Sequence, residues 1–335
     1  MACIDAIECI KNKIPDQMKI KNNKSILKLI CCMFITLLYS CNNSSEKYTD
    51  TPISGNISIA VDETFQPIAD SEIKVFEGLY NSTSIKANYC SEKQAFDYLL
   101  KDSVRLIIVS RKLNQSEHKL FEDKKFFPKE VKIATDAIAL IVNNENKDTL
   151  ITIEELKDIL TGKITNWKQK LSSTKLDKIQ LVFDNQSSST VRLILDSVCR
   201  GAKLSVEVKA LDKNKEVIDF VSQNHNAIGI IGVSWVSNSS DSTSLSFLDR
   251  IKVMSVSVDK KATIENSYQP FQYYLSNGKY PLLRNVFVII SEPRIGLASG
   301  FTSFLASDKG QRIIKKSGIL PATVPLNMVK MRSDL

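Results

Sequence analysis

Histidine is scarce in this sequence, and the short motifs that mark many enzyme sites are missing. Only His118 and His225 occur among 335 residues, and neither has a partner at the spacing of a metal site. The chain contains no G-x-x-x-x-G-K-[ST], G-x-G-x-x-G, G-x-S-x-G or H-E-x-x-H. These absences exclude the common signatures of nucleotide binding, serine hydrolysis and zinc proteolysis. A hydrolase assembled from distant residues stays an alternative, but no enzyme, metal or cofactor is expected.

The sequence also lacks an apolar run long enough to span a bilayer. Residues 29–39 are eleven uncharged, mostly apolar residues that follow four lysines, which is typical of a signal peptide. The run ends in Leu38-Tyr39-Ser40-Cys41, which resembles the lipobox of bacterial lipoproteins, although Tyr39 departs from it. Residues 1–40 are therefore predicted as a lipoprotein signal peptide, with Met18 as an alternative start. A plain secretory signal or an uncleaved anchor is the alternative.

A lipid on Cys41 would hold the body at the bacterial cell envelope through a polar tether, residues 41–56. Four of the seven cysteines precede Cys41, which leaves Cys90 and Cys199 in the body. Their separation is weak evidence for a disulfide, and both are expected to be buried apolar residues.

A long run of charge of one sign is also absent. The formal net charge is +8, and residues 1–40 carry six lysines and three acidic residues, or +3 of it. The remaining +5 is dispersed, which indicates a solvated surface and no nucleic-acid groove.

The body contains short apolar runs that alternate with amphipathic stretches. Runs such as residues 106–109 predict strands buried on both faces, and Ser91 and Thr152 each open a capping box before a helical stripe. This alternation predicts an α/β fold with largely parallel sheets. Strands are expected at residues 57–61, 106–109, 137–142, 180–183, 228–231, 253–258 and 286–290.

Three polar clusters follow predicted strands. Residues 184–190 read D-N-Q-S-S-S-T and precede the stripe of residues 191–198, so their hydroxyls and free N–H groups could surround an oxyanion or could simply cap the helix. Residues 62–67 and Ser110-Arg111 follow two other strands. Ligands of open α/β sheets bind beyond the carboxyl ends of strands, so the clusters together predict a binding site.

At these positions the chain resembles the phosphate-binding proteins of Pst-type ABC transporters, which have the type II periplasmic-binding-protein fold. The resemblance covers nearly all of residues 57–325. The matching stretches, in order, are Thr64-Phe65-x-Pro67, T-D-A-I-A-L-I-V-N at 135–143, T-G-K-I-T-N-W at 161–167, Ser188-Ser189-Thr190, A-I-G at 227–229, Y-P-L-x-R at 280–284 and G-Q…G-I-L-P at 310–321.

The resemblance implies two α/β lobes, each with a mixed, mostly parallel sheet flanked by helices, joined by a hinge of two crossings. Lobe one would be residues 57–136 plus 284–330, and lobe two residues 137–283. An anion would bind in the cleft between the lobes and close them.

The family's binding residues carry over to a limited set of positions. Thr64 and Phe65 would supply a hydroxyl and a backbone N–H, and Ser91 would match a serine at a helix start. Ser110, which follows the predicted strand of residues 106–109, would match the serine of the family's S-D-x-P-L motif. The loop of the second lobe would be Ser187, Ser188, Ser189 and Thr190, with Ser189 in the place of the family's glycine.

Two departures concern charge. Arg111 stands where the family often has Asp, and Asp184 stands where it has Arg. Together they read as a charge swap, in which Arg111 donates to the oxyanion and Asp184 accepts a proton from it. The alternative is that Asp184 caps its loop while Arg111 forms a surface ion pair. Asp62 could orient the first loop, Asp136 is expected to be structural, and Arg192 could face the cleft or solvent.

The resemblance implies a monomeric, lipid-anchored solute-binding protein that passes phosphate or a similar oxyanion to an ABC permease. One alternative is a surface sensor or interaction protein that uses the same lobes for another ligand. The other is a secreted hydrolase that uses one of the serines at 187–189.

Overall fold

The structure is a computed structural model that describes residues 50–205, 207–237 and 242–325. The predicted signal peptide, Met18 and the lipidation site Cys41 lie outside these residues. No helix in the described part of the chain is long and apolar enough to cross a membrane. Strands and helices alternate along the described residues, which confirms the predicted α/β class.

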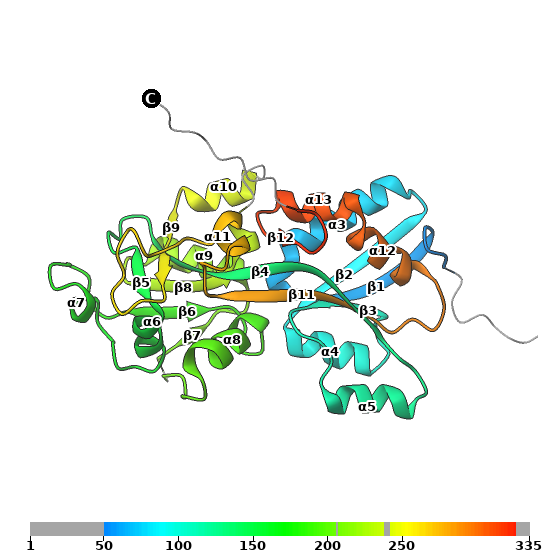
Figure 1. Ribbon diagram of the computed structural model, residues 1–335, viewed down its shortest axis with the longest axis horizontal. Helices are drawn as coiled ribbons and strands as arrows, with labels where there is room; N and C mark the ends of the chain where they lie inside the picture. The colour runs from blue at the N-terminus through cyan, green and yellow to red at the C-terminus, as the bar shows by residue number, and fades with distance from the viewer. Residues whose placement is uncertain (1–49, 206, 238–241, 326–335) are drawn as a thin grey trace, which may run out of the picture. The chain divides into compact units, whose positions relative to one another are not determined.

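The first strand group has the order β2-β1-β3-β11-β4 across the sheet. Strand β1 is parallel to β2 and β3, whereas β11 is antiparallel to β3 and β4. The group and its helices are shown in Figure 1. The elements are β1 (Gly55–Asp62), η1 (Glu63–Phe65), α3 (Gln66–Leu79), β2 (Thr83–Cys90), α4 (Glu92–Leu100), β3 (Leu106–Val109), α5 (Gln115–Asp123), β4 (Lys129–Asn143), β11 (Leu283–Ile290), α12 (Leu297–Ala306), α13 (Asp308–Lys316) and β12 (Leu320–Pro321).

The second strand group continues from β4 in the order β4-β8-β6-β7. Strand β6 is parallel to β7 and β8, while β8 and β9 are antiparallel to β4. The elements are β5 (Leu150–Thr152), α6 (Ile153–Leu160), α7 (Trp167–Lys170), β6 (Gln180–Phe183), α8 (Ser189–Leu193), η2 (Ile194–Cys199), β7 (Lys209–Ala210), α9 (Asn214–Gln223), β8 (Ala227–Gly232), η3 (Val233–Trp235), α10 (Ser242–Leu248), β9 (Ile251–Val253), β10 (Ser255–Ser257) and α11 (Gln272–Ser276). Strands β5 and β10 form a separate parallel pair.

Strand β4 belongs to both groups. Its first half pairs with β11 as far as Ala137, and its second half pairs with β8 from Ile138 onward. The hydrogen-bonded sheet is therefore continuous through β4, where the sequence predicts two sheets; Figure 1 shows β4 and β11 side by side between the groups. Residues 136 and 284 are register partners, so the predicted lobe boundaries lie opposite each other.

Two helices begin at the capping boxes that the sequence predicts. The Ser91 hydroxyl accepts from the Gln94 N–H, and the Gln94 side chain accepts in turn from the Ser91 N–H. Thr152 and Glu155 form the same reciprocal pair at α6. Each box satisfies donors that the first turn of a helix leaves free, which fixes the start of the helix.

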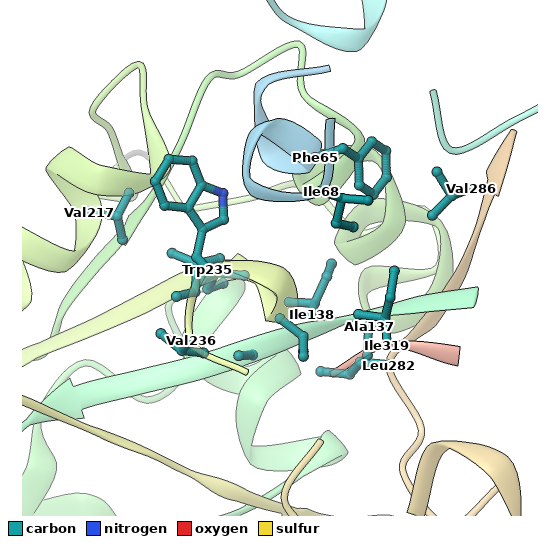
Figure 2. Close-up of a cluster of buried hydrophobic side chains, with 14 of the residues drawn as sticks. Phe65, Ile68, Ala137, Ile138, Val217, Trp235, Val236, Leu282, Val286 and Ile319 are labelled. Carbon is teal, nitrogen blue, oxygen red and sulfur yellow. The ribbon is translucent and has the colours of Figure 1, made fainter. Parts of the chain in front are cut away.

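The larger hydrophobic core runs through both strand groups. Figure 2 shows part of it, where Phe65 and Ile68 meet Ile138 of β4 and Trp235 of η3. A smaller cluster, which includes Phe96 and Ile289, packs α4 and α5 against the sheet. Both body cysteines are free thiols; Cys199 is buried, as predicted, and Cys90 is only half-buried.

The end of the predicted tether is part of the folded body. The Asp50 carboxylate is buried, accepts the Leu297 N–H at the start of α12 at 2.6 Å and forms an ion pair with Arg105. Strand β1 then begins at Gly55. Residues 50–56, the last part of the predicted tether, thus include a residue bonded to the body and the start of a strand.

Candidate functional site

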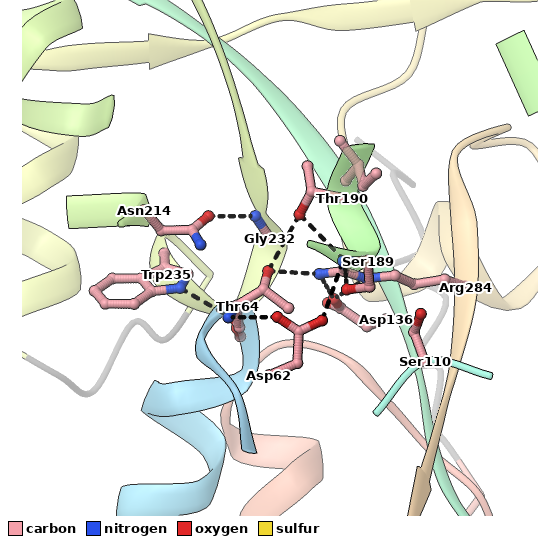
Figure 3. Close-up of polar contacts among 12 residues, drawn as sticks. Asp62, Thr64, Ser110, Asp136, Ser189, Thr190, Asn214, Gly232, Trp235 and Arg284 are labelled. Atoms are coloured by element: carbon pink, nitrogen blue, oxygen red, sulfur yellow. Dashed lines mark hydrogen bonds and ion pairs between the residues drawn. The ribbon is translucent and has the colours of Figure 1, made fainter. Parts of the chain in front are cut away.

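The loops that follow β1 and β6 meet at a buried polar cluster. Thr64 lies in η1, directly after β1, and Ser189 and Thr190 open α8 after β6. All three side chains are buried, and the hydroxyl oxygens of Thr64 and Thr190 are 3.5 Å apart. Residues separated by more than 120 positions in the chain are thus neighbours, as the predicted convergence at strand ends requires (Figure 3).

Arg284 of β11 occupies the centre of these hydroxyls. Its Nη1 donates to Ser189 Oγ at 2.8 Å and to Thr190 Oγ1 at 3.3 Å, and its Nη2 donates to Thr64 Oγ1 at 2.8 Å. The guanidinium also forms an ion pair at 2.7 Å with Asp136, which is the register partner of Arg284 on β4. It lies over the ring of Phe65 as well. A planar guanidinium with several donors is well suited to bind the oxygens of carboxylates and phosphates.

Asp62 bridges the two loops. Its Oδ1 accepts the Thr64 N–H at 3.4 Å, and its Oδ2 accepts the Ser189 N–H from the other loop at 3.2 Å. The side chain is fully buried, and burial followed by the negative charge of Glu92 raises the pKa of Asp62.

A second carboxylate bridge connects Glu92, Ser110 and Arg192. Glu92 Oε1 accepts from both the N–H and the hydroxyl of Ser110 at 2.8 Å, and Glu92 Oε2 accepts from Arg192 Nε at 2.7 Å. Arg192 also donates to Ser110 Oγ at 2.6 Å. Burial opposes ionisation of Glu92, but these donors outweigh it and hold its pKa below the ordinary value.

Asp184 and Glu63 lie on the far side of the cluster and share Asn214. Asp184 accepts from the Ser188 hydroxyl at 2.6 Å and from the Asn214 amide at 3.2 Å, and burial raises the pKa of Asp184 to about 8. Glu63 accepts from the backbone and side chain of Asn214, and burial raises its pKa as well. Asn214 in turn accepts the Gly232 N–H.

A cavity of about 210 Å³ adjoins the cluster. Its walls come from the loops of both strand groups, and they include Asp62, Ser91 and Ser188. Asp212 and Lys213 add one charge of each sign to the lining. The volume suits a small solute.

Most of the residues that the sequence predicts for the site lie in or beside this cluster. Ser91 lines the cavity while its hydroxyl serves the capping box of α4, and Ser187 contributes its carbonyl oxygen, which accepts the Lys93 N–H at 3.3 Å. The structure brings together Thr64, Phe65, Ser91, Ser110, Asp184, Ser187, Ser188, Ser189 and Thr190.

Arg111 is the exception. Its two Nη atoms donate to the Glu117 carboxylate at 2.7 and 2.8 Å, and its guanidinium stacks 3.6 Å from the centre of the Phe96 ring. These contacts hold it on the α4–α5 side, and its described contacts do not include Asp184. In this structure Arg111 is thus engaged away from the hydroxyl cluster. The geometry matches the alternative, in which Arg111 forms its own ion pair and Asp184 binds within its loop.

The two arginines of the site, Arg284 and Arg192, were not predicted as binding residues. Arg284 appeared only as the end of a Y-P-L-x-R stretch, and Arg192 only as an open choice between cleft and solvent. The i+3 relation of Arg192 to Ser189 could have placed it beside the serine loop. Glu63 lies in the polar cluster of residues 62–67, but Asn214 and Glu92 belong to no predicted binding motif.

Neither histidine lies in the cluster. His118 pairs with Glu130 and His225 with Glu145, and both imidazoles are more than two-fifths exposed. Ser188 and Ser189 therefore have carboxyl and guanidinium neighbours, and no imidazole among the described residues activates them. The arrangement is that of a binding site: hydroxyls and N–H groups are bonded to two guanidinium groups, and a small cavity lined by Asp62, Ser91, Ser188 and other residues adjoins them.

Comparison with known proteins gives consistent results. Residues 46–309 match a family model described as a PBP superfamily domain. The phosphate-binding protein PstS of Borreliella burgdorferi is 26% identical over 303 residues, which are 89% of this chain and 98% of that protein. The PstS protein of Staphylococcus aureus strain USA300 is 25% identical over 280 residues, 82% of this chain and 81% of that protein.

Solved structures match about as much of the chain. A candidate phosphate ABC transporter substrate-binding protein from Clostridium perfringens, crystallised with bound phosphate, matches with a TM-score of 0.67 at 25% identity and covers 80% of this chain and 99% of its own. An ABC-type phosphate transport receptor from Vibrio cholerae matches with a TM-score of 0.57 at 21% identity, over 80% and 100% of the two chains.

Proposed function

The chain belongs to the PBP superfamily, and from that premise we propose that it is a solute-binding protein that takes up inorganic phosphate, or a similar oxyanion, for an ABC permease. The relatives from Borreliella burgdorferi and Staphylococcus aureus are named phosphate-binding proteins, and the Clostridium perfringens protein is named as part of a phosphate ABC transporter. The division into lobe one, residues 57–136 plus 284–330, and lobe two, residues 137–283, is part of this proposal. The protein acts as a monomeric carrier and not as an enzyme.

One observation carries the proposal: hydroxyls from two distant loops converge on a single buried guanidinium. Thr64, Ser189 and Thr190 surround Arg284 beside a small cavity. Hydroxyls and a forked guanidinium recognise an oxyanion without covalent chemistry. The ligand would join the two loops and stabilise the closed arrangement of the lobes.

Membrane attachment through Cys41 completes the proposal. An acylated Cys41 would hold the carrier on the outer side of a membrane, close to its permease. Mass spectrometry of the envelope fraction should detect a lipid-modified N-terminal cysteine. Cys41→Ser should release the protein into the soluble fraction, whereas retention of the variant in the membrane would contradict lipid anchoring.

Calorimetric titration tests the ligand. Phosphate, arsenate, sulfate and molybdate are titrated into the full-length protein and into Arg284→Gln, which keeps a polar side chain but loses the charge. Saturable phosphate binding that Arg284→Gln lowers by about tenfold or more supports the proposal. Absence of binding by all four anions would favour the sensor alternative, and turnover of a chromogenic ester would favour the hydrolase.

A further inference from the structure

The N–H donors of the site are already bonded to carboxyl groups of the chain itself. Asp62 accepts from Thr64 N and Ser189 N, one donor from each of the two loops. A bound oxyanion would be expected to accept from such a pair, because it would bridge the loops with two oxygens in the same manner. Asp62 therefore stands where one edge of an oxyanion would bind.

Glu92 repeats this arrangement on the next loop. Its carboxylate accepts from the N–H and hydroxyl of Ser110 and from the guanidinium of Arg192. Ser110 and Glu92 belong to the first strand group, whereas Arg192 follows the serine loop of the second. This internal carboxylate joins the two groups through a guanidinium, as a bound anion would.

The cations of the cluster are already paired with carboxyl groups of the chain. The carboxyl groups of Asp62, Glu63, Glu92, Asp136 and Asp184 are all buried, against the guanidinium groups of Arg284 and Arg192. Arg284 is neutralised by Asp136, and Arg192 by Glu92. A phosphate dianion would therefore enter a site whose cations are already paired, at a cost that burial increases.

We propose that Asp62 and Glu92 are specificity-determining residues: their carboxylates occupy the oxyanion donors, so that an anion binds only by displacing them. The inference rests on the proposed function and deepens it. It predicts that phosphate binds weakly, so that the site fills only at high phosphate concentration. It also assigns Asp62 as a competitor of the ligand and not as a residue that contacts the ligand.

Calorimetric titration of phosphate at pH 8 tests the inference on the full-length protein. Asp62→Asn retains an oxygen for one N–H but loses the charge, and Glu92→Gln does the same at the second bridge. Asp219→Asn is the matched control, because it removes one carboxylate that pairs with Lys215 and Arg250 on the outside of α9. The affinity should rise about tenfold or more in each site variant and change less than about twofold in the control.

The pH dependence isolates Asp62. The charged groups that face it are Glu92 on α4, Arg284 on β11, Asp184 after β6 and Arg192 on α8, with the Cys90 thiol on β2. Phosphate itself ionises in the same way in titrations of the wild type and of Asp62→Asn. The ratio of the two phosphate affinities therefore reports only the ionisation of groups in the protein. Since a protonated Asp62 competes less, the advantage of Asp62→Asn should shrink from pH 8 to pH 6.

The outcomes separate the two proposals. If the wild type binds phosphate and both site variants bind it equally or more weakly, the carboxylates are not competitors, and this inference is wrong while the proposed function stands. If Asp62→Asn fails to fold, Glu92→Gln decides in the same way. If neither the wild type nor any variant binds phosphate, the proposed function is overturned and this inference with it.

Discussion

Glu72 is a buried carboxyl group without a hydrogen-bond partner among the described residues. It lies on α3 with no measurable exposure. Burial raises the pKa of Glu72 to about 9, because an ionised carboxylate would lose its hydration. The side chain is therefore neutral at pH 7. Its polar atoms lose their hydration on folding and gain no hydrogen bond that would compensate, which destabilises the folded state.

Replacement of Glu72 by Met should stabilise the protein. Met has a similar volume and no polar atom to satisfy, so we expect a gain on the order of 1 kcal/mol in the free energy of unfolding at pH 6. The pKa of the folded state lies above that of the unfolded state, so the folded protein retains a proton that the unfolded chain releases. The contribution of Glu72 to stability consequently falls as the pH rises from about 4 toward 9, and the advantage of Glu72→Met should grow over that range.

Urea denaturation at pH 6 and pH 9 measures this effect. Glu77→Met is the matched control on the same helix, because Glu77 accepts the Ile85 N–H at 2.7 Å and its loss should destabilise. A stability loss in Glu72→Met at both pH values would show that Glu72 has a role that its contacts do not reveal.

At the scale of elements, the start of α12 depends on a residue far away in the chain. Asp50 accepts the Leu297 N–H and pairs with Arg105 and Arg294. Burial raises the pKa of Asp50, but the Leu297 N–H and Arg105 together lower it further, which leaves it below the ordinary value. The N-cap of α12 is Gly296, which has no side chain to cap the helix. Asp50 accepts the N–H of the first helical residue, and Glu292 accepts the Ser299 N–H at 2.9 Å.

Asp50→Ala should therefore loosen α12. We expect a loss of about 1–3 kcal/mol in unfolding free energy at pH 7, as for a hydrogen bond to a charged group. The difference from the wild type should vanish as the pH falls through the lowered pKa of Asp50, because the protonated group no longer attracts the arginines. Chemical denaturation measures both effects, with the exposed Asp97→Ala on α4 as control. An equal loss at pH 7 and pH 3 would contradict the electrostatic explanation.

Elements with a strong local pattern could be predicted from the sequence, whereas others could not. Strands β3 and β6 begin and end where the apolar runs do, and the boxes at Ser91 and Thr152 start α4 and α6. Strand β2 was missed because it lies at the sheet edge, where its mixed sequence T-S-I-K-A-N-Y-C has no clear alternation. Helix α3 was missed although Pro67 stands in its first turn, which is a recognised signal.

The site was harder to predict than the fold, because its charged residues meet only through the pairing of distant strands. Arg284 meets Asp136 only because β11 and β4 align these two residues as partners. The contact between Asp62 and Ser189 joins residues 127 positions apart. The hydroxyl loop could be read from local sequence, but the partner of each charged group depends on tertiary contacts that no local pattern contains.

At the scale of the whole described body, the loops of the two strand groups are bonded to each other without a ligand. Glu63 accepts from Asn214 at three contacts, and Trp235 Nε1 donates to the Thr64 carbonyl at 3.1 Å. Together with Asp62, Glu92 and Arg284, these bonds span the proposed cleft. Closure of a two-lobed binding protein is an equilibrium, and such bonds shift it toward the closed state before ligand arrives.

Glu63→Ala tests this shift. The substitution removes the acceptor of the Asn214 N–H and side-chain amide, so the closed state should lose on the order of 2 kcal/mol relative to the open state. Asn214 also holds the Gly232 N–H through its side-chain oxygen. Hydrogen exchange should therefore quicken at the amides of Asn214 and Gly232, and saturating phosphate should restore part of the protection.

The control is Glu207→Ala, which breaks an ion pair with Lys178 in which both partners are at least half exposed, and which should leave these amides unchanged. Unaltered exchange in Glu63→Ala would mean that the other bridges suffice to hold the loops together. Faster exchange confined to these amides, while the strands of the core keep their protection, would place the weak point of the molecule between the two strand groups, where a binding protein has to open to admit its solute.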